Sequence, residues 1–304
     1  MEELKKTEHI IANDIGDAHI TVYNVFPGIQ LVYHSVHMDE FDLGFATEGN
    51  LIEIHHCREG RIEQKFDDEY FYLMPGDLSV ALRTQVLSTY KFPLRHYHGI
   101  TIGINMDQVI EAEVYPIMEL NLNPLGLAQK LCGERNSYII RSEKYIEHLF
   151  SELYSVPDSI KESYFKVKVL ELLVILSGKE QADHQQPIQM VPLSQVQNAS
   201  QISEYLSEHL KENITIPELS KQFNVSETHL KNLFKNVYGV PIATYMRIQK
   251  MQAAAQVLIH TDRPVAEIAY EFGYNNTSKF TSAFQKIIGD TPSEYRKMHT
   301  KCHK

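Results

Sequence analysis

The sequence lacks tryptophan entirely and has only three cysteines in 304 residues. Cys57, Cys132 and Cys302 lie far apart without CxxC spacing, which argues against a disulfide framework or a thiolate zinc site. The longest apolar run, VLELLVIL at 169–176, is too short to span a bilayer and contains Glu171. The first ten residues also lack the apolar region of an export signal. We therefore expect a cytoplasmic protein in a reducing compartment, with no membrane partner.

Charge differs strongly between the two ends of the chain, although the whole carries a net charge of −10. Residues 1–196 hold 16 Lys and Arg against 29 Asp and Glu, whereas residues 197–304 hold 13 against 10. Phosphates require basic partners, so only the second part has a charge balance compatible with nucleic acid. With 43% hydrophobic residues, the chain is long enough for two globular domains.

The first part of the chain reads as β-structure between residues 20 and 105. Its β-rich runs are short and are separated by turn signals such as Pro75-Gly76-Asp77. Many short strands at this spacing predict an antiparallel barrel or sandwich. The runs are LIEIHHC (51–57), RIEQKF (61–66), YFYLM (70–74), LSVAL (78–82) and GITIGI (99–104).

Helical periodicity replaces the strands from about Pro124 onward. Two helices at 142–155 and 158–177 predict a hairpin, the second beginning at Asp158. The stripe on that second helix either packs on its own domain or forms a dimer contact. The stripe comprises Ile160, Tyr164, Val167, Leu170 and Val174.

A polar segment with two prolines, 177–195, has no clear periodicity and is interpreted as a linker. It divides the chain into a first domain, 1–176, and a second domain, 196–304. The predicted fold class is therefore α+β with two domains, a β-barrel with a helical hairpin followed by an all-α domain.

An internal repeat occupies the second domain. The copies are TIPELSKQFNVSETHLKNLFKNVYGVP (215–241) and RPVAEIAYEFGYNNTSKFTSAFQKIIGDTP (263–292). In each copy a short helix, a tight turn and a longer amphipathic helix follow one another, which predicts two helix-turn-helix units at 216–237 and 265–288. The equivalent positions include Leu219 with Ile268, Phe223 with Phe272, Leu230 with Phe280, and Phe234 with Phe284.

The second helix of each unit carries short polar, amide and cationic side chains opposite its apolar face. Such side chains reach base edges and phosphates, although any solvated surface helix has a polar face as well. Because both copies share the pattern, we favour DNA contact. The predicted DNA-binding residues are Thr228, Lys231, Asn232 and Lys235 in the first unit, and Ser278, Lys279, Thr281, Ser282 and Gln285 in the second.

The second copy closely resembles the C-terminal signature of AraC/XylS-type bacterial transcription regulators, and the resemblance covers about 200–299. One departure is Gln285, where a basic residue is common, and another is Lys250, which stands for the usual arginine of the connecting helix. The matching residues are Ile268, Ala269, Gly273, Tyr274, Ser278, Phe280, Phe284, Gly289, Thr291, Pro292, Tyr295 and Arg296.

The resemblance implies that both units bind adjacent major grooves of a promoter and activate transcription with RNA polymerase. It further implies a cupin-like N-terminal barrel that binds a small effector, and a helical hairpin, at about 142–177, that makes a homodimer. We accordingly expect a regulator without enzymatic activity or cofactor.

The barrel region is rich in histidines, which raises an alternative function. A metal-dependent cupin enzyme, or a metal or redox sensor, would use histidines and a carboxylate, or the thiol of Cys57. However, His96-Tyr97-His98 is followed by no close acid, so we predict no metal site and a buried Cys57. The effector itself remains unknown. The candidates for its binding are His34, His55, Cys57, His96 and His98.

Overall fold

The computed structural model describes residues 5–13, 16–42, 48–66, 69–85, 89–133, 137–179, 190–212 and 214–299. The chain divides into two compact units, Met1–Met190 and Val191–Lys304. Most of the predicted linker at 177–195, namely 180–189, lies outside the described residues. Among the described helices, none combines the length and apolar character that a membrane span requires.

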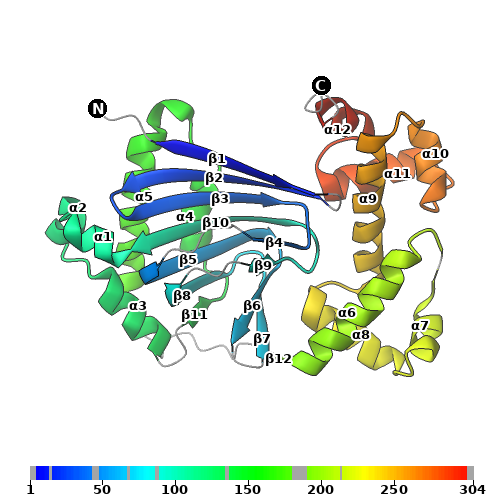
Figure 1. The fold of residues 1–304 in the computed structure, drawn as a ribbon, viewed down its shortest axis with the longest axis horizontal. Coiled ribbons are helices and arrows are strands. Elements are labelled where there is room, and N and C mark those ends of the chain that lie inside the picture. The colour runs from blue at the N-terminus through cyan, green and yellow to red at the C-terminus, as the bar shows by residue number, and fades with distance from the viewer. Residues whose placement is uncertain are drawn as a thin grey trace. The chain divides into compact units, whose positions relative to one another are not determined.

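The first unit is built on a seven-stranded antiparallel sheet with the strand order β1-β2-β3-β10-β5-β8-β11 (Figure 1). Its strands are β1 (Lys6–Ala12), β2 (Asp17–Phe26), β3 (Ile29–Val36), β5 (Glu48–Gly60), β8 (Leu78–Gln85), β10 (Tyr97–Asn105) and β11 (Ser137–Ile140). A second sheet contains, in order, β7 (Glu69–Leu73), β6 (Ile62–Phe66), β9 (Thr89–Lys91) and β4 (Glu40–Asp42). The antiparallel fold class is thus confirmed, but the sheets do not close into a single barrel.

The two faces of the large sheet have different coverings. On β10, Ile100, Ile102 and Ile104 join the apolar core that contains residues of α3 (Pro124–Cys132), α4 (Lys144–Leu153) and α5 (Lys161–Ser177). These helices cover one face of the sheet (Figure 1). The opposite face packs partly against the second sheet, through a core that includes Val36, Cys57, Phe71 and Tyr97. The short helices α1 (Met106–Glu111) and α2 (Tyr115–Glu119) follow β10.

The helical hairpin exists as α4 and α5, and part of its predicted apolar stripe faces solvent. A 3-10 turn, Asp158–Ile160, precedes α5, which therefore begins at Lys161. Side chains of the predicted stripe are exposed, by 48% at Ile160, 59% at Val167 and 48% at Val174. The helix is apolar around most of its circumference, so its spacing alone did not identify the buried face. That face comprises Phe165, Val169, Leu172, Leu173 and Leu176.

The second unit is helical, apart from β12 (Val191–Pro192). Its central helix α9 packs against helices of both repeats, and α12 covers its C-terminal half. The helices are α6 (Leu193–Glu208), α7 (Ile216–Gln222), α8 (Glu227–Tyr238), α9 (Ile242–His260), α10 (Val265–Glu271), α11 (Thr277–Ile288) and α12 (Pro292–His299).

Candidate functional site

The two helix pairs, α7–α8 and α10–α11, have the same turn between their helices. Asn224 and Gly273 hold equivalent left-handed backbone positions, with φ of 51° and 84°. Immediately afterwards, Val225 N–H donates to the carbonyl of Ser220 at 3.1 Å, and Tyr274 N–H donates to that of Ala269 at 2.9 Å. Asparagine and glycine are the residues that tolerate this backbone conformation best. The repeat in the sequence is therefore a repeat in backbone geometry.

Side-chain caps fix where α8 and α11 begin. Ser226 accepts a hydrogen bond from His229 N–H at 3.2 Å. In the second copy, Asn276 accepts from Ser278 N–H at 2.8 Å and from Lys279 N–H at 3.1 Å. These bonds satisfy backbone donors that have no partner inside the helix, and they fix the first turn from which the outer side chains project.

The apolar faces of α8 and α11 are anchored on opposite halves of α9. Phe234 packs near Tyr245 in the first half, whereas Phe284 belongs to a core with Met251 and Leu258 in the second. A straight helix of this length spans about 28 Å, close to the roughly 34 Å that separates successive major grooves on one side of DNA. The fold thus gives α9 the role of spacer between two similar helix faces.

The side chains predicted to contact DNA lie away from these cores. All are exposed except Thr281, which is half-buried. His229 is also exposed on α8 and was not predicted, because its helical position lies between the polar and apolar faces. The exposed set is Thr228, Lys231, Asn232 and Lys235 on α8, and Ser278, Lys279, Ser282 and Gln285 on α11.

The two exposed faces both carry cations and hydrogen-bonding groups, in different proportions. Lys231 and Lys235 give α8 two cations, the first of which lies 3.4 Å from the carboxylate of Glu227. On α11, Lys279 is an exposed cation, and Ser282 and Gln285 offer hydroxyl and amide groups. Cations suit phosphates, whereas hydroxyls and amides suit base edges in the major groove.

Two basic residues singled out from the sequence have structural contacts instead. Lys250 is only 9% exposed, its Nζ donates to the Glu212 carbonyl at 3.3 Å, and burial lowers its pKa. Arg296 donates through Nε to the Leu258 carbonyl at 3.1 Å and through Nη2 to the Arg263 carbonyl at 2.6 Å. Carbonyls near a helix C-terminus lack intrahelical donors, so Arg296 stabilises the end of α9.

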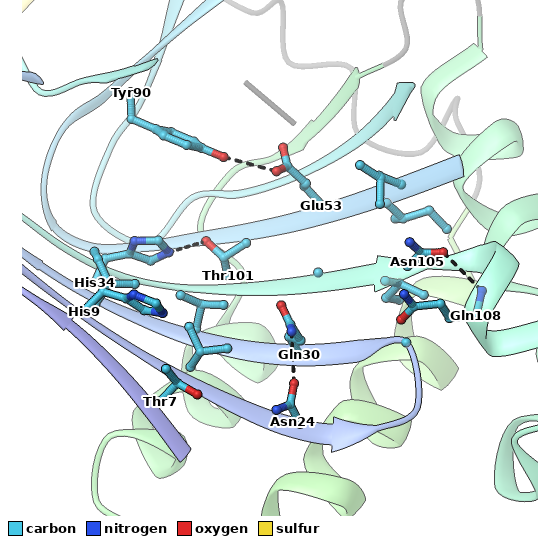
Figure 2. A pocket seen from close by; sticks show the side chains of 18 residues that line it. Thr7, His9, Asn24, Gln30, His34, Glu53, Tyr90, Thr101, Asn105 and Gln108 are labelled. Carbon is cyan, nitrogen blue, oxygen red and sulfur yellow. Dashed lines mark hydrogen bonds between the residues drawn. The ribbon is translucent and has the colours of Figure 1, made fainter. Parts of the chain in front are cut away.

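A cavity of about 440 Å³ lies in the first unit, on the face of the large sheet opposite the helices (Figure 2). One set of its lining residues is apolar and includes Ile20, Val22 and Val32. Another set is polar, without any Lys or Arg among the described lining residues. The labelled polar residues are Thr7, His9, Asn24, Gln30, His34, Glu53, Tyr90, Thr101, Asn105 and Gln108.

Hydrogen bonds connect three of the polar lining residues in a row through a fourth residue, His55, which lies behind them. The Thr101 hydroxyl lies 2.8 Å from His34 Nε2 and 2.8 Å from His55 Nδ1, and His55 Nε2 lies 3.4 Å from Glu53 Oε2. A carboxylate only accepts, so His55 Nε2 donates to Glu53. The Thr101 hydroxyl bridges the two imidazole rings. Burial lowers the pKa of His34 to about 3, so this ring is neutral near pH 7.

Glu53 is ionised inside the cavity because several groups compensate its charge. Arg83 Nε donates to it at 2.6 Å and the Tyr90 hydroxyl at 3.1 Å. Burial alone would raise the pKa of Glu53, but the hydrogen bond from His55, with the charge and hydrogen bond of Arg83, outweighs it and lowers the pKa to about 2. The cavity therefore has no uncompensated charge to offer a ligand.

The predicted effector candidates fall into separate places. His34 lines the cavity and His55 lies behind Thr101, whereas Cys57 is fully buried, and burial raises the pKa of its thiol. A thiol in this state is not a reactive thiolate. His96 and His98 belong to a different cluster, with His37, whose candidate ligand atoms lie within 4.8 Å of one another.

Sequence reasoning missed the polar residues that complete the cavity, Glu53, Tyr90 and Thr101 among them. Which of these residues lie close together depends on strand register. Thr101 of β10 pairs with His55 of β5 on one side and with Val32 of β3 on the other. The available signal was the alternation of polar residues along each strand, which indicates one polar face but not which residues meet on it.

Comparison with known proteins identifies the helical part of the chain. A family described as "Helix-turn-helix domain" matches residues 219–298. The chain is 28% identical over 138 residues to the HTH-type transcriptional regulator ExsA of Pseudomonas aeruginosa, an alignment that covers 45% of this chain and 48% of that protein. It is 31% identical over 93 residues to the right origin-binding protein of Escherichia coli K12, covering 31% of this chain and 32% of the other.

Among solved structures, the C-terminal domain of AraT, a response regulator from Geobacillus stearothermophilus, is 27% identical, with a TM-score of 0.32. The alignment covers 33% of this chain and 84% of that domain. The chain spans about half or less of the curated relatives it matches, and the two alignments described above reach no further than 138 residues.

Proposed function

Because the chain carries the DNA-binding domain of AraC/XylS-type regulators, we propose that it controls transcription by binding promoter DNA in response to a small molecule held in its first unit. The observation that carries this proposal is the pair of exposed polar faces on α8 and α11, each on the same scaffold and each supported by its own half of α9. Two such faces suit two successive major grooves.

Each copy has a distinct part in the proposed recognition. Lys231 and Lys235 of α8 neutralise phosphates and fix the register on the duplex. Ser282 and Gln285 of α11 read base edges, since their hydroxyl and amide groups both donate and accept. In this arrangement α8 supplies mainly affinity and α11 mainly sequence discrimination.

The proposed effector is an uncharged molecule with hydroxyl or amide groups along one side and an apolar face along the other. Gln30 and Asn24, joined by a 2.9 Å hydrogen bond, and the His34–Thr101 pair supply polar partners around the cavity. Val22 and Val32 supply the apolar wall. Small-molecule sites typically combine such a wall with a few directional polar groups.

The apolar residues exposed on α5 support a homodimer contact in the proposed regulator. Val167 and Val174 are seven positions apart and therefore share one side of the helix. Effector binding would then change how two DNA-binding units are presented to a promoter and to RNA polymerase, usually as an activator. The compensated charge of Glu53 and the absence of a metal cluster among the described cavity residues favour a sensor over the alternative cupin enzyme.

The proposal is tested by selecting genomic DNA fragments with the purified full-length chain at two salt concentrations. We expect paired sequence motifs about one helical turn apart, with affinity that falls as salt rises. Binding to all fragments alike at both salt concentrations would contradict sequence-specific regulation.

The effector is tested on a selected fragment with a panel of neutral polyols and amides against matched carboxylates. Only a neutral compound should change the affinity for DNA. Thr101→Val should remove the response while DNA binding without the compound stays within about twofold, because the cavity and the recognition helices belong to different units. A response to carboxylates alone would contradict the proposed ligand class.

A further inference from the structure

Three histidines meet on the face of the large sheet that points away from the cavity. We propose that His37, His96 and His98 bind a divalent transition-metal ion, Zn²⁺ in particular. Their candidate ligand atoms all lie within 4.8 Å of one another. This site is separate from the regulatory cavity, and it does not depend on the proposed function.

Strand register brings the three residues together. In a strand, residues two apart share a face, so His96 and His98 lie on one side while Tyr97 between them is buried in the core on the other. Tyr97 of β10 pairs with Val36 of β3, which places His37 beside His96 where the same register continues. Cavity residues Thr101 and His34 occupy the opposite face of these two strands.

The distances between the rings fit a single small ion. The ring centroids of His96 and His98 are 4.8 Å apart, and His37 lies 5.6 Å from His96 and 5.5 Å from His98. Nitrogen ligands around Zn²⁺ at about 2.0–2.1 Å lie roughly 3.3 Å from one another, so small rotations of the rings suffice. All three side chains are half-buried, which leaves solvent access for the ion.

The chemistry of the donors selects the class of ion. Neutral imidazoles suit Zn²⁺, Cu²⁺ and Ni²⁺, whereas Mg²⁺ and Ca²⁺ prefer oxygen ligands. Three imidazoles leave one tetrahedral position open for water or another ligand. Zn²⁺ suits this geometry, has no redox chemistry and would link the end of β3 to the start of β10.

A carboxylate stands next to the cluster. Glu59 of β5 pairs with His98 in the strand register, and its Oε2 lies 3.4 Å from His96 Nε2. Arg58 partly compensates its charge, with Nε 3.6 Å from Glu59 Oε1 and the guanidinium 4.3 Å above the Tyr154 ring. In metal sites a carboxylate bonded to a ligand histidine orients the ring and raises affinity. Glu59 is therefore a positioning residue for His96.

The test is equilibrium binding of Zn²⁺ to the untagged full-length chain in a chelator-buffered solution. We expect one saturable ion per chain, and Co²⁺ in its place should give the visible absorption of a four-coordinate site. His37→Asn and His98→Asn should each weaken Zn²⁺ binding by more than about a hundredfold. Glu59→Gln should weaken it by about ten- to a hundredfold, as expected for an outer-shell partner.

His148→Asn is the matched control, because this histidine is 74% exposed on α4 and lies beside a carboxylate, Glu152. It should leave Zn²⁺ affinity within about twofold of the unaltered chain. Zn²⁺ should also raise the unfolding temperature of the unaltered chain and of His148→Asn but not that of His37→Asn. Absence of saturable binding to the unaltered chain would overturn the proposal, and so would an affinity in either ligand variant equal to that of the unaltered chain.

Discussion

The first unit of this protein buries many of its charged and polar side chains, whereas the second exposes most of them to solvent. In the first unit, charged and polar side chains such as Glu53, His55 and Thr101 are buried beneath or beside a cavity. In the second, the described buried polar side chains are Gln249 and Lys250, and the polar groups of α8 and α11 face solvent.

This difference matches the size of the partner that each unit is proposed to bind. A small molecule can be enclosed, so its polar contacts lie inside a sheet structure and must be hydrogen-bonded to one another when the ligand is absent. DNA cannot be enclosed by so small a unit, so its contacts lie outside a largely apolar core. Burying histidines should lower the stability of the first unit in acid, because a buried imidazole resists protonation whereas an unfolded one does not.

Acidification should therefore produce the largest difference in stability between the two units. Burial lowers the pKa of His34 to about 3 and of His56 to about 4. These rings take up protons below about pH 6.5 only when unfolded, so their contribution to stability is complete above that pH and is lost toward pH 4. Two such groups remove about 3 kcal/mol of unfolding free energy per pH unit in this range.

The measurement is peptide-resolved hydrogen exchange of the full-length chain between pH 7 and pH 5, corrected for the intrinsic rate. We expect protection of β3 and β10 to fall first, while α8 and α11 keep theirs, because His229 and His260 of the second unit are exposed. Earlier loss of protection in the second unit would contradict the inferred asymmetry. His34→Asn should reduce the pH dependence by about one half.

A second comparison concerns the two repeats within the helical unit. Phe234 and Phe284 are equivalent and both are fully buried. Phe234→Ala and Phe284→Ala should each lower the free energy of unfolding by about 3–5 kcal/mol, measured by urea denaturation. Exchange protection should fall mainly in the repeat that carries the change.

Conservative variants separate packing from a general effect of substitution. Phe234→Leu and Phe284→Leu keep most of the volume and should cost less than their alanine counterparts. If either alanine variant removed protection equally from both repeats, the two halves would form one cooperative unit, and the assignment of each repeat to its own half of α9 would be wrong.

The sequence predicted the repeats well because each depends on contacts that are close along the chain. The caps, the turn at Asn224 or Gly273 and the three- and four-residue spacing of Leu230 with Phe234 all lie within about 25 residues of one another in each copy. The cavity and the histidine cluster depend on which strands are neighbours. His34 meets Thr101 only because β3 pairs with β10, and no local pattern specifies that pairing.

The sequence left the buried face of α5 undecided for another reason. Its sequence offers apolar residues on several sides, so more than one stripe has helical spacing. Phe165 decides between them in the structure, because its ring packs edge-on against Tyr23 at 5.0 Å between centroids. A prediction from one helix could not contain this contact, since Tyr23 belongs to β2.

The helices proposed to contact DNA, α8 and α11, offer a third contrast. Lys231→Ala should weaken binding to every sequence alike and reduce the slope of log affinity against log salt by about one. Ser282→Ala should keep that slope but reduce discrimination at one base pair by about 1–3 kcal/mol. Fluorescence anisotropy with matched and mismatched duplexes at several salt concentrations measures both effects.

Lys130→Ala is the control for charge, because it removes an exposed lysine from α3 of the other unit. It should change neither the salt slope nor the discrimination between duplexes. A salt slope unchanged in Lys231→Ala would show that this lysine does not neutralise a phosphate. Loss of discrimination in Lys231→Ala with none in Ser282→Ala would reverse the roles proposed for α8 and α11.

The smallest effects should come from the turns, where the repeats differ by one residue type. Gly273→Ala places a Cβ in the left-handed region, with φ of 84°, and should cost about 1–2 kcal/mol of unfolding free energy. Asn224→Gly occupies the same conformation without strain but makes the unfolded chain more flexible, so the change should stay below about 1 kcal/mol. Urea denaturation measures both, and a larger loss in Asn224→Gly than in Gly273→Ala would mean that the asparagine side chain, rather than its backbone, stabilises the first turn.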